Sequence, residues 1–251
     1  MKKQKLICII LFAAIIGFAV NSCQGTGKTS NTVKTEFNGD VLTYNERGTN
    51  EDGYDYEFWK SNNNVTGKMT LGDGGAFKCE WSNGGNILFR SGKRYPSNQP
   101  HTAYGNFSIN YSARYLPGEP GISYLSVYGW TRNPLIEYYI VESYAGSYHP
   151  GSSGIKKGSF TIDGEGTYDV YTREMYQQPA IAGPGRYDFI QYISVRTVKR
   201  TSGTISVTRH FEEWQKLGLD MSGGLYEVMM KVEGYNNNGR AEVTVNELIL
   251  N

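Results

Sequence analysis

Cysteine is scarce in this 251-residue sequence, which contains only Cys8, Cys23 and Cys79. Cys8 lies inside an apolar N-terminal segment that has the composition of a removable export signal, and Cys23 follows this segment directly. If Cys23 is lipidated, Cys79 has no partner, and we expect no intrachain disulfide. The mature chain must then be stabilised by its hydrophobic core, and about 215 residues can bury enough surface for that.

Histidine is equally scarce, and neither sign of charge dominates. His101, His149 and His210 do not have the spacing of metal ligands, so we interpret them as structural and expect no metal and no cofactor. The 25 basic and 24 acidic residues form no basic patch with interleaved aromatic residues, which argues against a nucleic-acid partner. A Gly-x-Ser-x-Gly motif is missing, so esterase chemistry has no obvious nucleophile.

Long hydrophobic runs are missing too, apart from one at the N-terminus. Residues 6–20 are apolar and follow three lysines, but the run is too short for a membrane span of ~20 residues. It ends in the sequence VNSC, which looks like a lipobox with Cys23 as the lipidated first residue. We therefore predict a lipoprotein signal peptide over residues 1–22 and a flexible tether over 23–36.

This pattern predicts export. The protein would be a membrane-anchored lipoprotein at the cell envelope or surface, touching the membrane only through the lipid on Cys23. The alternative is ordinary signal-peptidase cleavage nearby, with Cys23 incidental and the protein secreted.

Aromatic residues and glycine, in contrast, are abundant, with 20 Tyr, 10 Phe and 31 Gly. Short segments rich in β-branched and aromatic residues recur between turn-forming clusters, and several alternate with period two. Eleven such segments predict strands: 76–81, 87–90, 104–111, 123–130, 137–143, 158–162, 167–172, 189–197, 203–208, 226–235 and 241–250. So many strands within one domain, residues 37–251, indicate an all-β fold of two antiparallel sheets packed as a β-jelly-roll sandwich.

One segment has a helical pattern instead. In residues 210–218, Phe211, Trp214 and Leu217 are spaced three apart with polar residues between them, and Gly218 ends the pattern. We expect one short amphipathic α-helix here, with Phe211 and Trp214 as packing anchors rather than ligand contacts.

Two glutamates stand in unusual surroundings. Glu137 and Glu233 each lie among aromatic and β-branched residues in a segment with strand character, although carboxylates are rarely buried without a partner. For an arbitrary glutamate the simplest interpretation is a strand position facing water. Two such carboxylates are also what a glycosidase needs, one as nucleophile and one as general acid/base.

Strand alternation decides which side chains share a face with Glu137. Tyr139 is two residues away and lies on the same face, and Tyr128 and Trp130 form the corresponding cleft-facing set of the preceding strand. A sheet face lined with Tyr and Trp suits a sugar polymer, because flat rings stack on pyranose faces while phenols bind hydroxyls. The alternative is that the tyrosines reflect simple β-propensity.

The motifs around both glutamates resemble those of the family 11 glycoside hydrolases, the compact endo-β-1,4-xylanases. Residues 124–139 read YLSVYGWTRNPLIEYY and are similar to the nucleophile region of that family, while residues 232–239 read VEGYNNNG and are similar to its acid/base region. Four further landmarks match in order: EWSN at 80–83, GTYDVY at 166–171, QPAI at 178–181 and QYISVR at 191–196. The resemblance extends from about residue 53 to the C-terminus.

The resemblance implies a fold with a deep concave cleft and assigns residues to it. Glu137 would be the nucleophile and Glu233 the general acid/base of a retaining double displacement, which requires carboxyl groups roughly 5–5.5 Å apart. Asn86 would lie beside the acid/base, and Pro179 at the tip of a thumb loop over about 176–186. The expected substrate-binding residues are Trp59, Asn86, Tyr128, Trp130, Tyr139, Pro179, Gln191 and Tyr235.

Two positions depart from the family pattern. Met175 stands where many members have an arginine just before the thumb, so a contact of that arginine is missing or is supplied by another residue such as Arg173. Tyr226 precedes Glu233 by seven residues, where many members have a tyrosine six residues before. An odd spacing puts the two on opposite faces of an unbroken strand, so either a β-bulge returns Tyr226 to the cleft or it belongs to the core.

These inferences predict an endo-1,4-β-xylanase that acts as a monomer on xylan and xylo-oligosaccharides. Two alternatives stay open: a non-catalytic carbohydrate-binding β-sandwich, and a β-1,4-glucanase of related fold. Comparing hydrolysis of xylan with that of carboxymethyl-cellulose would distinguish them.

Overall fold

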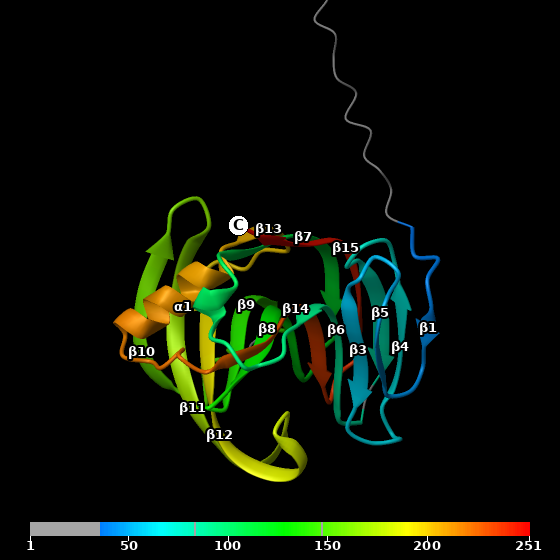
Figure 1. The fold of residues 1–251 in the computed structure, drawn as a ribbon. Coiled ribbons are helices and arrows are strands. Elements are labelled where there is room, and N and C mark those ends of the chain that lie inside the picture. Colours follow the sequence, from blue (N-terminus) through cyan, green and yellow to red (C-terminus); the bar gives the residue numbers. More distant parts are fainter. Residues whose placement is uncertain (1–35, 83, 147) are drawn as a thin grey trace, which may run out of the picture. The chain divides into compact units, whose positions relative to one another are not determined.

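The computed structural model of the protein describes residues 36–82, 84–146 and 148–251 (Figure 1). Residues 35–251 form one compact unit. The signal peptide predicted at 1–22, the lipidation site predicted at Cys23 and all but the last residue of the predicted tether lie outside the described residues.

Two β-sheets make up this unit, and the predicted all-β sandwich with one short α-helix is confirmed. In strand order, the six-stranded sheet consists of β1 (Val41–Leu42), β4 (Thr66–Leu71), β5 (Phe77–Ser82), β15 (Gly239–Leu250), β7 (Phe107–Pro117) and β13 (Ser202–Ile205). The nine-stranded sheet consists of β10 (Ile155–Ile162), β11 (Gly166–Ala180), β12 (Gly183–Arg196), β9 (Ile136–Tyr144), β8 (Ile122–Arg132), β14 (Gly224–Tyr235), β6 (Asn86–Arg94), β3 (Asp55–Lys60) and β2 (Glu46–Thr49).

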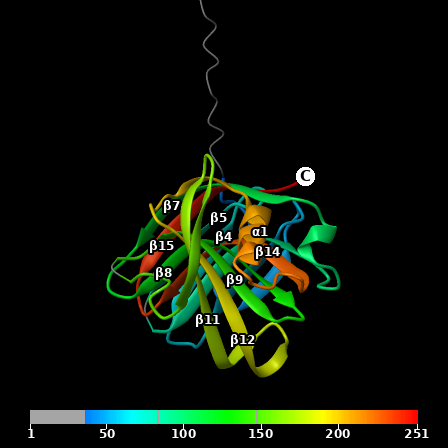
Figure 2. The same cartoon turned by 90° about the vertical axis from the view of Figure 1, so that its left-hand side faces the viewer.

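One strand pair departs from the antiparallel pattern. β12 runs parallel to β9, with Gln191 opposite Glu137 and Tyr192 opposite Tyr138. The other strand pairs of both sheets are antiparallel. Figure 2 shows β11 and β12 as long neighbouring strands at one side of the nine-stranded sheet.

The hydrophobic core lies between the two sheets and follows the alternation along each strand. On β8, Leu125 and Val127 are fully buried in this core, and on β14 the same holds for Val228, Met230 and Val232. Full burial of such a side chain contributes roughly 1.5–3 kcal/mol relative to exposure. Because alternate residues point to opposite faces, this inward set leaves the intervening residues of β8 and β14 on the other face of the nine-stranded sheet.

The helix α1 (Val207–Lys216) begins three residues earlier than predicted, and Thr208 is helical instead of ending a strand. A carboxylate explains the early start: Glu165 accepts hydrogen bonds from the backbone N–H of Ser206, at 3.0 Å, and from its hydroxyl. An anionic side chain at a helix N-terminus is stabilised by the helix dipole. Among the described residues no helix is long and apolar enough to cross a membrane.

The predicted anchors of the helix are in the core. Phe211 and Trp214 are fully buried, and both pack edge-on against Tyr138, with ring centroids 5.0 and 6.0 Å apart. Tyr138 follows Glu137 on β9, so the helix packs against the strand that carries the glutamate.

Two parts of the sheets were not predicted from the sequence. The strands β1 to β4 were not expected, and the supposed loop at 176–186 is a β-hairpin, because β11 continues to Ala180 and β12 begins at Gly183. Register shifts at Met175/Gln178 and at Gln178/Ala180 mark β-bulges in this hairpin, and bulges bend strands. In Figure 1 the hairpin extends below the other strands, and its end curls back toward them.

Candidate active site

A cleft of about 1060 Å³ opens on the face of the nine-stranded sheet that points away from the core. Side chains from β2, β3, β6, β8, β9, β11, β12 and β14 line it. The structure brings all the residues predicted for the site, apart from Cys23, together in this cleft: Trp59, Asn86, Tyr128, Trp130, Glu137, Tyr139, Pro179, Gln191, Glu233 and Tyr235.

Glu137 is held by three hydrogen bonds. Its Oε1 accepts from the hydroxyls of Tyr128, at 2.7 Å, and Tyr139, at 3.1 Å, while its Oε2 accepts from Nε2 of Gln191 at 2.6 Å. Strand register explains the convergence, since Gln191 lies directly opposite Glu137 and Tyr139 directly opposite Tyr128. The residue is only 7% exposed, so protein groups rather than water fix the orientation of its carboxyl.

Burial and hydrogen bonding act against each other on this carboxyl. Burial raises the pKa of Glu137, while the charge of Lys231 and the hydrogen bonds from Gln191 and Tyr128 oppose that rise. Donors to the ionised form favour it, so these groups support a carboxylate at a position from which water is largely excluded.

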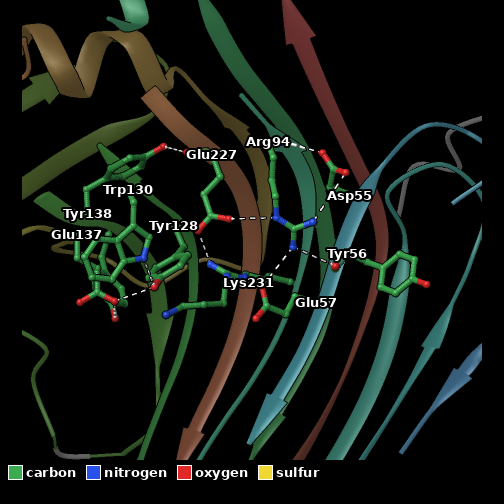
Figure 3. Close-up of polar contacts among 12 residues, drawn as sticks. Asp55, Tyr56, Glu57, Arg94, Tyr128, Trp130, Glu137, Tyr138, Glu227 and Lys231 are labelled. Atoms are coloured by element: carbon green, nitrogen blue, oxygen red, sulfur yellow. Dashed lines mark hydrogen bonds and ion pairs between the residues drawn. The ribbon is translucent and has the colours of Figure 1, made fainter. Parts of the chain in front are cut away.

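A second hydrogen bond fixes the phenol of Tyr128. Nε1 of Trp130 donates to the Tyr128 hydroxyl at 2.6 Å, and that hydroxyl donates onward to Glu137 (Figure 3). The Trp130 ring packs edge-on against Phe189 at 4.8 Å. A hydroxyl rotates to suit its partners. Because the Tyr128 oxygen accepts the indole N–H, its own proton is directed to Glu137.

Glu233 lies on β14 and faces the same cleft. Its Oε2 accepts a hydrogen bond from Nζ of Lys231 at 2.5 Å. In the strand register Leu88 lies opposite Glu233 and Asn86 lies opposite Tyr235, so Asn86 is the diagonal neighbour of Glu233. Oδ1 of Asn86 is buried without a hydrogen-bond partner within the described ranges.

Sequence analysis did not single out Lys231, although the signal was present. It precedes Glu233 by two residues, so alternation places it on the cleft side of β14, between the inward Met230 and Val232. The structure buries it completely.

A buried ion-pair network was missed as well. Arg90 contacts Glu227 and Glu57. Arg94 contacts Glu57, at 3.2 Å, and Asp55, at 3.8 Å (Figure 3). The Arg90 guanidinium carbon lies 5.0 Å from the ring centroid of Tyr128. These charged residues lie on β3, β6 and β14, far apart in the sequence. Through Arg90 they pack against Tyr128, which donates a hydrogen bond to Glu137.

A β-bulge resolves the position of Tyr226. The β14–β8 register shifts between Leu225 and Glu227, and Tyr226 lines the cleft beneath the guanidinium of Arg132, 5.4 Å from the ring centroid. The extra residue changes the parity, so a tyrosine seven positions before Glu233 reaches the same face.

The position of the expected arginine is filled by an apolar side chain. Met175 lines the cleft and packs against the aromatic cluster around Trp130 and Phe189. Arg173 also lines the cleft, but its Nη2 donates to the carbonyl of Pro150 at 3.2 Å.

Histidines and acidic residues do not gather around the cleft in a ligand set. Within residues 36–82, 84–146 and 148–251, no group of three or more His, Cys, Asp or Glu could hold a metal ion. His210 is fully buried against Tyr168 and Trp214, and burial lowers its pKa to about 3. His101 is buried against Phe211, and burial also lowers its pKa.

The architecture and the sequence have counterparts among known proteins. An endo-1,4-beta-xylanase A from Bacillus pumilus is 52% identical over 210 residues, which cover 84% of this chain and 87% of that protein. An endo-1,4-beta-xylanase A from Thermoclostridium stercorarium is 49% identical over 210 residues, and the chain spans only 31% of its length. The structure of the family 11 xylanase from Neocallimastix patriciarum is similar with a TM-score of 0.75 and 38% identity, over 84% of this chain and 99% of that chain.

The sequence profile of the glycosyl hydrolases family 11 matches residues 51–244. This match includes both glutamates of the cleft and most of the two sheets. The chain therefore belongs to the glycosyl hydrolases of family 11.

Proposed function

We propose that the protein is an endo-1,4-β-xylanase that hydrolyses internal β-1,4-xylosidic bonds with retention of configuration. The observation that carries this proposal is the pair of carboxyls in one cleft, Glu137 held by three donors and Glu233 by an ammonium. Two carboxyls flanking the scissile bond are the requirement of a glycosidase.

The different surroundings of the two carboxyls suit different tasks. A carboxylate oxygen of Glu137 attacks the anomeric carbon while Glu233 gives its proton to the departing glycosidic oxygen. The bond from the anomeric carbon to the leaving oxygen breaks, and an ester to Glu137 forms. Glu233, now ionised, takes a proton from water, whose oxygen displaces Glu137 from the sugar. Two displacements at one carbon restore its original configuration.

The cleft lining suits an extended sugar chain. Trp59 on β3, Tyr235 on β14 and Pro179 in the β11–β12 hairpin all line the cleft. The flat rings of Trp59 and Tyr235 can stack on pyranose faces. These features, together with relatives named endo-1,4-beta-xylanases, support xylan and xylo-oligosaccharides as substrates.

Two alternatives predict different outcomes in one experiment. The purified protein is incubated with xylan and, separately, with carboxymethyl-cellulose, and new reducing ends are measured. We expect reducing ends from xylan and at most a small fraction of that rate from carboxymethyl-cellulose. Preference for carboxymethyl-cellulose would identify a β-1,4-glucanase, and binding of xylan without any hydrolysis would identify a carbohydrate-binding module.

Variants connect this activity to the cleft. Glu233→Gln should lower turnover of xylan at least 100-fold, in the range that general acid–base catalysis contributes. Glu80→Gln is the matched control, because Glu80 is an exposed glutamate of the other sheet, paired with Lys68. It should keep wild-type activity. Near wild-type turnover in Glu233→Gln would reject the acid/base assignment.

We also propose that the enzyme is exported and anchored by a lipid on Cys23. The support is the sequence alone: an apolar run preceded by lysines and ending in VNSC. Mass spectrometry of the membrane fraction should show an acylated Cys23, and Cys23→Ser should release soluble enzyme. An unmodified Cys23 in a mature, soluble chain would contradict the anchor.

A further inference from the structure

A lysine is buried beneath the floor of the cleft, next to both glutamates. Lys231 has no solvent-exposed surface, and its Nζ donates to Oε2 of Glu233 at 2.5 Å. The same Nζ lies 3.8 Å from the ring centroid of Tyr128 and 4.1 Å from that of Tyr139. Those two tyrosines donate hydrogen bonds to Glu137. One ammonium therefore binds the Glu233 carboxyl directly and contacts the two phenol rings that hold the Glu137 carboxyl.

Burying an ammonium is costly, and a lysine is almost never fully buried without a charge partner. Burial lowers the pKa of Lys231, and the negative charges of Glu233 and Glu137 oppose this change. Two aromatic faces add cation–π attraction, which is larger in desolvated sites. An apolar residue would fill the same space without this cost, so the lysine has a role beyond packing.

The charged and titratable groups around Lys231 come from four strands. Glu233 and Glu227 lie on its own strand β14, Arg90 on β6, Tyr128 on β8, and Glu137 and Tyr139 on β9. The positive charge of Arg90 is balanced by its own ion pairs with Glu227 and Glu57. Lys231 therefore remains as the cation that interacts with the two cleft glutamates.

We propose that Lys231 is a positioning residue for the hydrolytic reaction: its buried ammonium holds the Glu233 carboxyl in place and sets the charge balance between Glu233 and Glu137. This proposal rests on the proposed function. Lys231 is not among the residues that line the cleft, so it acts through Glu233 and Glu137 and does not touch substrate.

The charge has a predictable effect on the pH dependence. A nearby cation favours the ionised form of a carboxyl. It opposes the rise in the pKa of Glu137 and so helps this carboxyl to ionise at lower pH. Lys231→Met keeps a long unbranched side chain and removes the charge. The acidic limb of the pH profile of kcat/KM on xylan, which reports ionisation of Glu137, should therefore move to higher pH, and kcat should fall because the Glu233 carboxyl loses its hydrogen-bond donor.

A titration that does not depend on activity separates this proposal from the proposed function. In protein labelled with 13C at glutamate carboxyls, the Glu137 signal is assigned by its loss in Glu137→Gln. The pKa of Glu137 should be higher in Lys231→Met than in the wild type, whether or not the protein hydrolyses xylan. Lys93→Met is the matched control, because Lys93 also lies over a tyrosine ring, 5.3 Å from the Tyr54 centroid, but outside the cleft.

A merely structural role would lower thermal stability in Lys231→Met without moving the acidic limb or the Glu137 titration, and that result would overturn the proposal. A second variant covers failure of Lys231→Met to fold. In Glu233→Gln, 15N NMR of the Lys231 amine should show a pKa lower than in the wild type, because an opposing carboxylate is gone. An unchanged Lys231 titration there would equally overturn the proposal.

Discussion

At the scale of single residues, β9 carries two glutamates in opposite environments. Glu137 faces the cleft, whereas Glu142, five positions on, faces the other side of the sheet. Glu142 is fully buried and pairs with Arg200 and with the hydroxyls of Tyr111, at 2.9 Å, and Tyr168, at 2.6 Å. The Glu137 carboxyl therefore faces the cleft, whereas the Glu142 carboxyl stabilises the packing on the other side of the sheet.

This difference predicts opposite effects of the same substitution. The raised pKa of Glu137 means that the folded state binds the proton more tightly than the unfolded state. Ionisation therefore costs stability once the pH rises above the ordinary glutamate value of about 4.3. Glu137→Gln should abolish turnover and raise the melting temperature at neutral pH, with the gain shrinking as the pH falls. Oε1 of Gln191, buried without a partner, can accept from the new amide after a flip of Gln191.

Glu142→Gln is the matched variant on the same strand. It removes one partner of a buried ion pair, which is destabilising by about 3–5 kcal/mol, but leaves the cleft side of β9 unchanged. Calorimetry should show a lower melting temperature, and the residual folded enzyme should keep its activity on xylan. If Glu137→Gln melts lower than Glu142→Gln at neutral pH, the burial of Glu137 is not a cost and this account of its environment is wrong.

Single residues also show what the sequence could and could not predict. Motif positions such as Trp130 and Gln191 were predicted for the cleft and lie there. Strand alternation alone could have placed Lys231 on the cleft side of β14, since it stands two residues before Glu233. The ion pairs of Arg90 could not be predicted, because its partners Glu57 and Glu227 are distant in sequence and nothing local indicates the pairing.

At the scale of elements, alternation predicted that Tyr128 and Trp130 of β8 lie on the cleft face, as they do, but it could not decide the face of Tyr226, where the register shifts. The bulge between Leu225 and Glu227 reverses the parity that would have placed Tyr226 in the core. A bulge adds one residue to one strand only, and its position depends on the partner strand, which the sequence of β14 does not specify.

The pairing of strands could not be predicted from the sequence either. The parallel pairing of β12 with β9 puts Gln191 beside Glu137, although 54 positions separate them in sequence. The strands β1 and β2 were missed because they are short and lie at sheet edges, where side chains can stay polar. The helix began earlier than its apolar spacing indicated, because its N-terminus is stabilised by Glu165, which lies before β11.

At the scale of the whole molecule, eight strands bring side chains from Arg47 to Tyr235 in the sequence into one cleft. The sandwich core between the sheets makes this possible, because it fixes the nine-stranded sheet on one face and leaves the other free for polar side chains. The central claim is that this cleft forms a covalent glycosyl ester on Glu137 during hydrolysis.

The most direct test is to trap that ester. A 2-deoxy-2-fluoro xylobioside with a good leaving group should glycosylate the nucleophile, with loss of the leaving group, and the glycosyl ester should then hydrolyse slowly, because the fluorine destabilises the oxocarbenium-like transition state of both steps. Intact mass spectrometry should show one added disaccharide, and peptide mapping should place it on Glu137, with no label in Glu137→Gln. A label on any other residue, or inverted product with no trapped ester in an enzyme that hydrolyses xylan, would contradict the mechanism.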